Sequence, residues 1–128
     1  MKRSEKKRLE DRCDVAWADA VKRRANYKCE KCWRTQDGLN AHHIEAKGSC
    51  GMYLRYHLDN GLALCDSHHT FGQVSAHSTS PQGGEEFNNW KDIYVGKERL
   101  ERLKNDKKRI TKYTTFTLLG LLQHLKAS

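Results

Sequence analysis

The sequence predicts an α+β protein in which a small metal-dependent core is flanked by N-terminal and C-terminal helices. Apolar residues recur at helical spacing near both ends of the chain, and the centre, from 26 to 84, is rich in Gly, Ser, His and Cys. Two pairs of metal-ligand residues lie within that centre. Because only 37% of all residues are apolar, we expect a bound metal to help define the fold of the core.

Length and charge limit the classes of protein to which this chain can belong. Its 128 residues are typical of one domain, with a basic N-terminal helix over 1–26, a metal-binding core over 27–78 and a helical extension over 79–128. Lys and Arg number 24 against 16 Asp and Glu, a formal net charge of +8. This excess favours a polyanionic partner such as nucleic acid, and a merely soluble basic protein is the alternative.

The same composition predicts a cytoplasmic protein. No apolar run is long enough to cross a membrane, and no apolar segment follows the basic start as it would in a secretory signal. In a reducing cytoplasm, paired cysteines hold metal more often than they form disulfides. The count of five cysteines is odd, which also argues against a complete disulfide framework.

The first predicted element is an amphipathic helix from about Glu5 to Arg24. Cys13 lies on its apolar face without a nearby partner, so we interpret it as a packed thiol and not as a ligand. The apolar residues recur at intervals of three and four, which places them on one face of the helix: Leu9, Cys13, Ala16, Trp17, Ala20 and Val21.

Two residue pairs with the spacing of zinc ligands follow this helix. Cys29-x-x-Cys32 is the pattern of a tight turn that directs two thiolates to one ion, although redox motifs share it. Cys65-x-x-His68 follows after a gap of 32 residues and makes a structural zinc the better interpretation. Such a site would join the two ends of the core. Cys50 lies in a predicted flexible loop without matching spacing and is not expected to be a ligand.

A β-hairpin with a long connection is predicted between these pairs. Residues 39–44 predict one strand, and residues 62–64 predict the second, after a turn that contains Asn60. Because neighbouring residues of a strand point to opposite faces, His42 and His43 cannot have the same role. One can face a metal and the other a substrate, or both can be surface histidines.

A short helix is predicted to begin near His68 and to continue past Phe71, with Asp66 or Ser67 as its cap. His68 and His69 would diverge by about 100° in its first turn. One of them can therefore serve the zinc while the other serves a separate site.

The C-terminal part predicts three helical segments. After a polar loop that ends at residues 83–84, Phe87 and Trp90 suit one helical face, and a charged helix follows from Lys97 to about Lys108. A last helix over about 117–126 either closes the core or pairs with another subunit. Its apolar face consists of four leucines: Leu118, Leu121, Leu122 and Leu125.

In combination, these motifs resemble the pattern of HNH endonucleases with an embedded zinc ribbon, here of three cysteines and one histidine. The resemblance covers about residues 27–78 and implies a ββα-metal (His-Me finger) core, in which a hairpin and a helix hold one catalytic divalent ion. The run 75–77, Phe87-x-x-Trp90 and the charged helix are similar to the phage-encoded branch of the family. The matching motifs are Cys29-x-x-Cys32, His42-His43-Ile44, Asn60 and Cys65-x-x-His68-His69.

The resemblance implies a role for each matching residue of the catalytic part. His43 matches the general base that deprotonates the attacking water. His42 and His69 match ligands of the catalytic ion, and Asn60 matches the residue that orients the hairpin and the base.

Two positions depart from the family pattern. His68 stands where the fourth zinc ligand is usually a cysteine, and zinc accepts either residue. The third histidine of the catalytic ion would fall at Gln73. His77, one helical turn further on, an amide oxygen of Gln73 or a water are the candidates for this ligand.

The resemblance implies a metal-dependent endonuclease that hydrolyses DNA phosphodiester bonds with little base specificity, by nicking or by double-strand cleavage. Mg²⁺ or Mn²⁺ is the expected catalytic ion beside a structural Zn²⁺, with nickel and cobalt as further options. Arg55 and Lys47 are candidates for phosphate contacts or are simply solvated. DNA is the expected partner, with phage packaging or recombination proteins as further partners, no membrane, and an open oligomeric state.

The alternative is a non-catalytic zinc-ribbon protein that binds DNA or assists recombination. It explains the four zinc-type residues and the net charge. It does not explain why His42, His43, Asn60 and His69 occur in the order of the HNH pattern.

Overall fold

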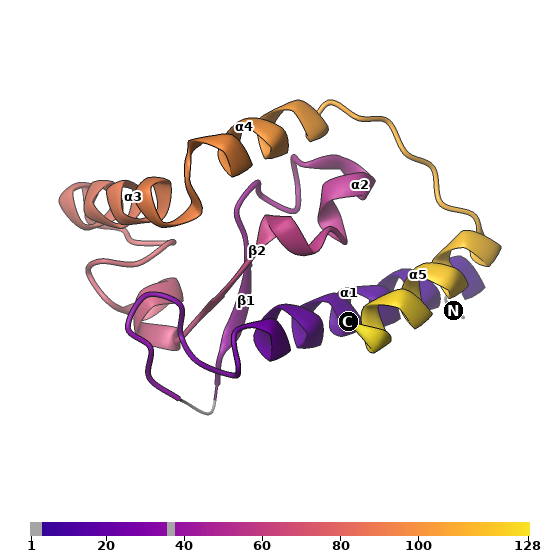
Figure 1. Ribbon diagram of the computed structural model, residues 1–128, viewed down its shortest axis with the longest axis horizontal. Coiled ribbons are helices and arrows are strands. Elements are labelled where there is room, and N and C mark those ends of the chain that lie inside the picture. Colours follow the sequence, from indigo (N-terminus) through magenta and orange to yellow (C-terminus); the bar gives the residue numbers. More distant parts are fainter. Residues whose placement is uncertain (1–3, 36–37) are drawn as a thin grey trace.

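The computed structural model describes residues 4–35 and 38–128, so residues 1–3 of the predicted N-terminal part lie outside the described residues. The fold is α+β, as the sequence predicts: the β-hairpin and α2 lie between α1 with α5 on one side and α3 with α4 on the other (Figure 1). The elements in chain order are α1 (Glu5–Arg24), β1 (Asn40–His43), α2 (Gly51–Arg55), the 3₁₀ turn η1 (Leu58–Asn60), β2 (Gly61–Leu64), the π-helical turn η2 (Ser67–Phe71), α3 (Pro81–Val95), α4 (Lys97–Asp106) and α5 (Thr115–Ala127).

Helix α1 has the predicted bounds and buries the predicted face. Its first turn is capped by Ser4, whose side chain accepts a hydrogen bond from the backbone N–H of Lys7. Cys13 is fully buried, and its thiol lies 3.5 Å from the carbonyl oxygen of Leu118 as a hydrogen-bond donor. The interpretation of Cys13 as a packed thiol is therefore confirmed.

Helix α5 packs along α1 and closes the main core. Leu118, Leu122 and Leu125 are buried against α1. A capping box between Thr114 and Thr117 starts the helix. Of the two alternatives for this helix, closing the core is the one that the structure shows.

The β-hairpin is short, and its second strand is completely buried. Strands β1 and β2 are antiparallel, with Asn40 opposite Leu64 and His43 opposite Gly61. Gly61 lies so close to Val21 of α1 that a Cβ atom there would overlap the valine side chain. The hairpin therefore rests directly on α1, and glycine permits this close approach.

Three local predictions need correction. The short helix does not continue past Phe71: the N–H of Gly72 bonds to the carbonyl of Ser67 and ends the π-helical turn. The polar loop before α3 ends earlier than predicted, because the side chain of Ser80 accepts a hydrogen bond from the N–H of Gly83 and starts the helix at Pro81.

The third correction concerns the predicted flexible loop around Cys50. Cys50 is fully buried against Leu54 and Leu103, directly before α2. The side chain thus anchors the connection between the two strands to α4.

Among the described residues, no helix combines the length and the apolar character that crossing a membrane requires.

Candidate metal centres

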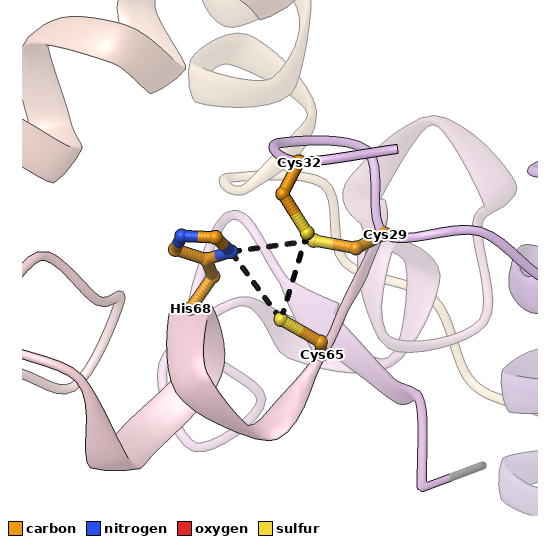
Figure 2. Close-up of side chains that lie close together, drawn as sticks. All are labelled: Cys29, Cys32, Cys65 and His68. Carbon is orange, nitrogen blue, oxygen red and sulfur yellow. Dashed lines mark hydrogen bonds between the residues drawn. The ribbon is translucent and has the colours of Figure 1, made fainter. Parts of the chain in front are cut away.

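Four side chains meet beside the end of β2 (Figure 2): Cys29, Cys32, Cys65 and His68. The Nδ1 atom of His68 lies 3.3 Å from Sγ of Cys65 and 3.6 Å from Sγ of Cys29, and Sγ of Cys32 lies 3.9 Å from Sγ of Cys65. A tetrahedral zinc at ordinary bond lengths holds two sulfurs about 3.8 Å apart, and a sulfur and a nitrogen about 3.6 Å apart. The four residues thus fit a metal ion such as zinc.

The two cysteines of the first pair lie on a tight turn. The N–H of Trp33 bonds to the carbonyl of Cys29 at 2.7 Å, and Lys28 and Thr35 form an antiparallel bridge on either side. Trp33 has a φ of 63°, a left-handed conformation that tight turns require and that is uncommon for a large side chain. The turn directs both sulfurs to the same side (Figure 2).

Glu30 attaches this turn to the hairpin. Its N–H donates to the carbonyl of Ala63 at 2.8 Å, and its carboxylate accepts the N–H of Ala63 at 2.6 Å. The other carboxylate oxygen accepts the hydroxyl of Tyr94 at 2.8 Å. Because Cys65 follows two residues after Ala63, this attachment positions the two cysteine-bearing segments relative to one another.

The thiols of this group lie in different electrostatic surroundings. Burial raises the pKa of the Cys29 thiol, but backbone hydrogen bonds from Cys65, Cys32 and Lys31 outweigh burial, so the pKa lies below its ordinary value. Burial raises the pKa of Cys65. Backbone N–H groups directed at a sulfur stabilise a thiolate, which is the form that binds metal.

A second group of three histidines lies beside the first. His42, His69 and His77 bring one ring nitrogen each to within 4.8 Å of one another. The rings of His69 and His77 are 4.7 Å apart between centroids, and His42 lies 5.4 Å from His69 and 5.0 Å from His77. Of the candidates for the third ligand, His77 is the one that the structure places together with His42 and His69.

The backbone after η2 explains this position of His77. The chain folds back on the turn, so that the N–H of His77 bonds to the carbonyl of His69 at 2.9 Å, and the N–H of Ala76 bonds to that of His68 at 2.9 Å. His68 and His69 point into different groups, as their adjacent positions on a helical turn predict.

Burial favours the uncharged rings of two members of this group, His42 and His69. Burial, with the positive forms of His77 and His69 acting in the same direction, lowers the pKa of His42 to about 3. Burial also lowers the pKa of His69, with His77 acting in the same direction. Neutral rings retain a lone pair on one nitrogen, which a divalent cation can use.

His43 points to the side of β1 opposite to His42 and stacks on Trp17 of α1. The two ring centroids lie 3.9 Å apart, and the ring planes make an angle of 10°. Its Nε2 lies 2.9 Å from the carbonyl oxygen of Arg55. Because a carbonyl can only accept, Nε2 carries the proton in the neutral ring and Nδ1 keeps its lone pair. Burial lowers the pKa of His43 below its ordinary value.

His43 and the histidine group open on one shared pocket. This pocket has a volume of about 190 Å³, and Lys47 lies at its edge. Its lining consists of Ala41, His42, His43, Ala46, Lys47, His69 and His77. A substrate in this pocket would reach the histidine group and His43 together.

Asn60 is fully buried and holds the connection between the strands. Its side-chain oxygen accepts the N–H of Glu45 at 2.7 Å, and its amide donates to the carbonyls of Glu45 at 3.0 Å and Leu54 at 3.2 Å. Its own carbonyl accepts the N–H of Ile44. These bonds fix the chain directly after His42 and His43.

Asn60→Asp is expected to destabilise the protein by about 2–4 kcal/mol, because a carboxylate would lose both donors and face two carbonyl oxygens in a buried site. Chemical denaturation measures the change. Asn88→Asp is the matched control, since Asn88 is exposed on α3. If Asn60→Asp and the parent had equal free energies of unfolding, the side-chain hydrogen bonds of Asn60 would not contribute to stability.

The two phosphate-contact candidates have different surroundings. The guanidinium of Arg55 donates to both carboxylate oxygens of Asp14, at 2.6 and 2.9 Å, and is therefore held by α1. Lys47 is exposed, lines the pocket and lies 3.4 Å from Asp14. Lys47 is thus available to a substrate in the pocket, whereas Arg55 positions the carbonyl that bonds to His43.

Sequence reasoning did not connect Trp17 or Asp14 with the site. Both lie on α1, where Trp17 is one member of the apolar face and Asp14 one of many charged residues. No local signal marks them, because their contacts with His43 and Arg55 join segments that lie far apart in the chain.

The protein thus belongs to the α+β class and carries a group of three cysteines and one histidine that can hold a metal such as zinc. A scan against protein-family models found no match for the chain, and the searches of curated proteins and of solved structures found no match either.

Proposed function

We propose that this protein is a metal-dependent HNH-type endonuclease with a ββα-metal core formed by β1, β2 and η2. The observation that carries the proposal is the shared pocket, in which three histidines able to hold a divalent ion lie beside a histidine with a free ring nitrogen. The order of these residues in the chain is that of the HNH pattern. The substrate is DNA, which the net charge of +8 favours.

The two proposed metal ions would be bound by different kinds of ligand. Thiolates and one imidazole suit a structural zinc, which would connect the Cys29 turn to the end of β2. His42, His69 and His77 would hold the catalytic divalent ion. Imidazole suits Ni²⁺ and similar transition metals, and Mg²⁺ or Mn²⁺, which prefer oxygen ligands, would also need oxygens of water or substrate. When bound, that ion supplies Lewis-acid stabilisation of the charge on the scissile phosphate and on the leaving oxygen.

The protein residues then have separate tasks. Nδ1 of His43 takes the proton of the attacking water, while the carbonyl of Arg55 keeps the proton on Nε2 and Trp17 holds the ring plane. Lys47 contacts a phosphate oxygen of the bound strand. Asn60 keeps the connection after β1 in place through its three side-chain hydrogen bonds.

The proposal is tested by incubating supercoiled plasmid with the zinc-loaded protein and adding Mg²⁺, Mn²⁺, Ni²⁺ or Co²⁺ in separate reactions. We expect relaxed or linear DNA with at least one of these ions, carrying 5′-phosphate ends that ligase can join. A protein that binds the plasmid but leaves it intact with every ion would be the non-catalytic zinc-ribbon alternative. The structure favours the nuclease, because the alternative gives no role to the three-histidine group.

A further inference from the structure

A row of aromatic rings leads from the histidine group to the tip of the cysteine turn. Successive ring centroids lie 6.4 Å apart for His42 and Phe87, 5.4 Å for Phe87 and Trp90, 5.0 Å for Trp90 and Tyr94, and 6.4 Å for Tyr94 and Trp33. Phe87, Trp90 and Tyr94 follow one another at intervals of three and four on α3, so they share one face of that helix.

The row becomes more exposed with distance from His42. Phe87 is 2% exposed, Trp90 is half-buried, Tyr94 is 37% exposed and Trp33 is 62% exposed. A single exposed apolar side chain is ordinary, but the rings of Tyr94 and Trp33 are exposed next to one another and so form a contiguous aromatic surface. The left-handed backbone of Trp33 belongs to the cysteine turn, so the ring is presented on a constrained turn.

Positive charge surrounds the exposed end of the row. Nζ of Lys31 lies 5.1 Å from the ring centroid of Trp90, and Lys28 and Arg34 are exposed on the same turn. None of these three cations has an ion pair among residues 4–35 and 38–128. The nearby carboxylate of Glu30 is buried and accepts hydrogen bonds from Ala63 and Tyr94, so it presents little negative charge to a ligand.

We propose that Trp33 and Tyr94 form a stacking surface for unpaired nucleotides of DNA, with Tyr94 held in place by its stacking on Trp90. Base faces stack on aromatic rings without regard to sequence, and the lysines and arginine beside them contact the phosphates. In a duplex the base faces are covered by their neighbours, so an aromatic surface of this kind has use only where a strand is unpaired. The inference rests on the proposed function in one respect: the surface would hold the strand next to the bond that the nuclease cuts.

Binding is measured by fluorescence anisotropy with a fluorescein-labelled oligothymidylate and with a labelled duplex of mixed sequence. The zinc-loaded full chain carries His43→Ala in every sample and no other divalent ion is added, so that binding is observed without cleavage. Trp33→Leu is expected to weaken binding of the single strand about 5- to 150-fold, the range that corresponds to the loss of one stacked base. Binding of the duplex changes much less.

Two variants serve as controls. Trp33→Tyr retains a stacking ring and is expected to bind the single strand nearly as well as its parent. Phe116→Leu removes another exposed ring, 83% exposed on α5, and is expected to leave both affinities unchanged. Zinc content and circular dichroism show that the variants are folded.

A second measurement uses the parent chain alone. Unlabelled oligothymidylate is expected to quench its tryptophan fluorescence, because stacking covers Trp33. If the quenching is absent, or if Trp33→Leu weakens binding of the single strand and of the duplex by the same factor, the stacking surface is refuted. Plasmid cleavage is a separate readout: an inert protein with Trp33-dependent binding would refute the nuclease and keep the stacking surface.

Discussion

Replacing His43 by alanine is expected to reduce DNA cleavage by about 100- to 10,000-fold, the usual contribution of a general base. The physical reason is that Nδ1 of His43 is the ring nitrogen left free by the bond between Nε2 and the carbonyl of Arg55. Nicking of supercoiled plasmid under saturating Mg²⁺ or Mn²⁺ measures the rate. Because burial lowers the pKa of His43, the lone pair that the proposed base needs is present down to a lower pH than in a free histidine.

Two comparisons make this result specific to catalysis. His124→Ala removes an exposed histidine on α5 outside the pocket and is expected to cut DNA at the parent rate. His43→Gln keeps most of the side chain on Trp17 and is expected to be as inactive as His43→Ala while its free energy of unfolding stays close to that of the parent. Cleavage by His43→Ala at the parent rate would remove His43 from the mechanism.

Cys65→Ser is expected to abolish zinc binding at the proposed four-ligand site, and with it the ordered centre of the protein. A serine hydroxyl is a poor zinc ligand, and structural zinc binds with an apparent free energy of about 10–16 kcal/mol. The whole folding free energy of a domain is about 5–15 kcal/mol, so losing this ion is enough to unfold the core. Mass spectrometry of the metal content and thermal unfolding followed by circular dichroism measure both effects.

Cys50→Ser is the matched control for this prediction. Cys50 is also fully buried, but it packs on Leu54 and Leu103 and lies outside the group of possible ligands. We expect this variant to keep one zinc per chain and to lose only the packing contribution of the thiol. A Cys65→Ser protein that retained a full equivalent of zinc would contradict the four-ligand site.

Sequence reasoning succeeded where the deciding interactions are local. The periodicity of α1 gives its correct bounds, because each apolar residue contributes to the same buried stripe whatever lies opposite. The Cys-x-x-Cys spacing predicts a tight turn for a similar reason, since the distance between its two sulfurs depends on four consecutive residues. By contrast, the sequence does not predict α2, because its five residues are too few to form a periodic pattern.

The α+β class, the amphipathic helices and the four zinc-type residues could be predicted from the amino-acid pattern alone. Long-range folding was needed to bring His77 to His42 and His69, to place Trp17 against His43, and to pack α5 on α1. Periodic burial and turn geometry are properties of neighbouring residues. The position of His77 instead depends on backbone hydrogen bonds that fold the chain back on η2. The positions of Trp17 and α5 depend on packing between segments that lie far apart in the chain.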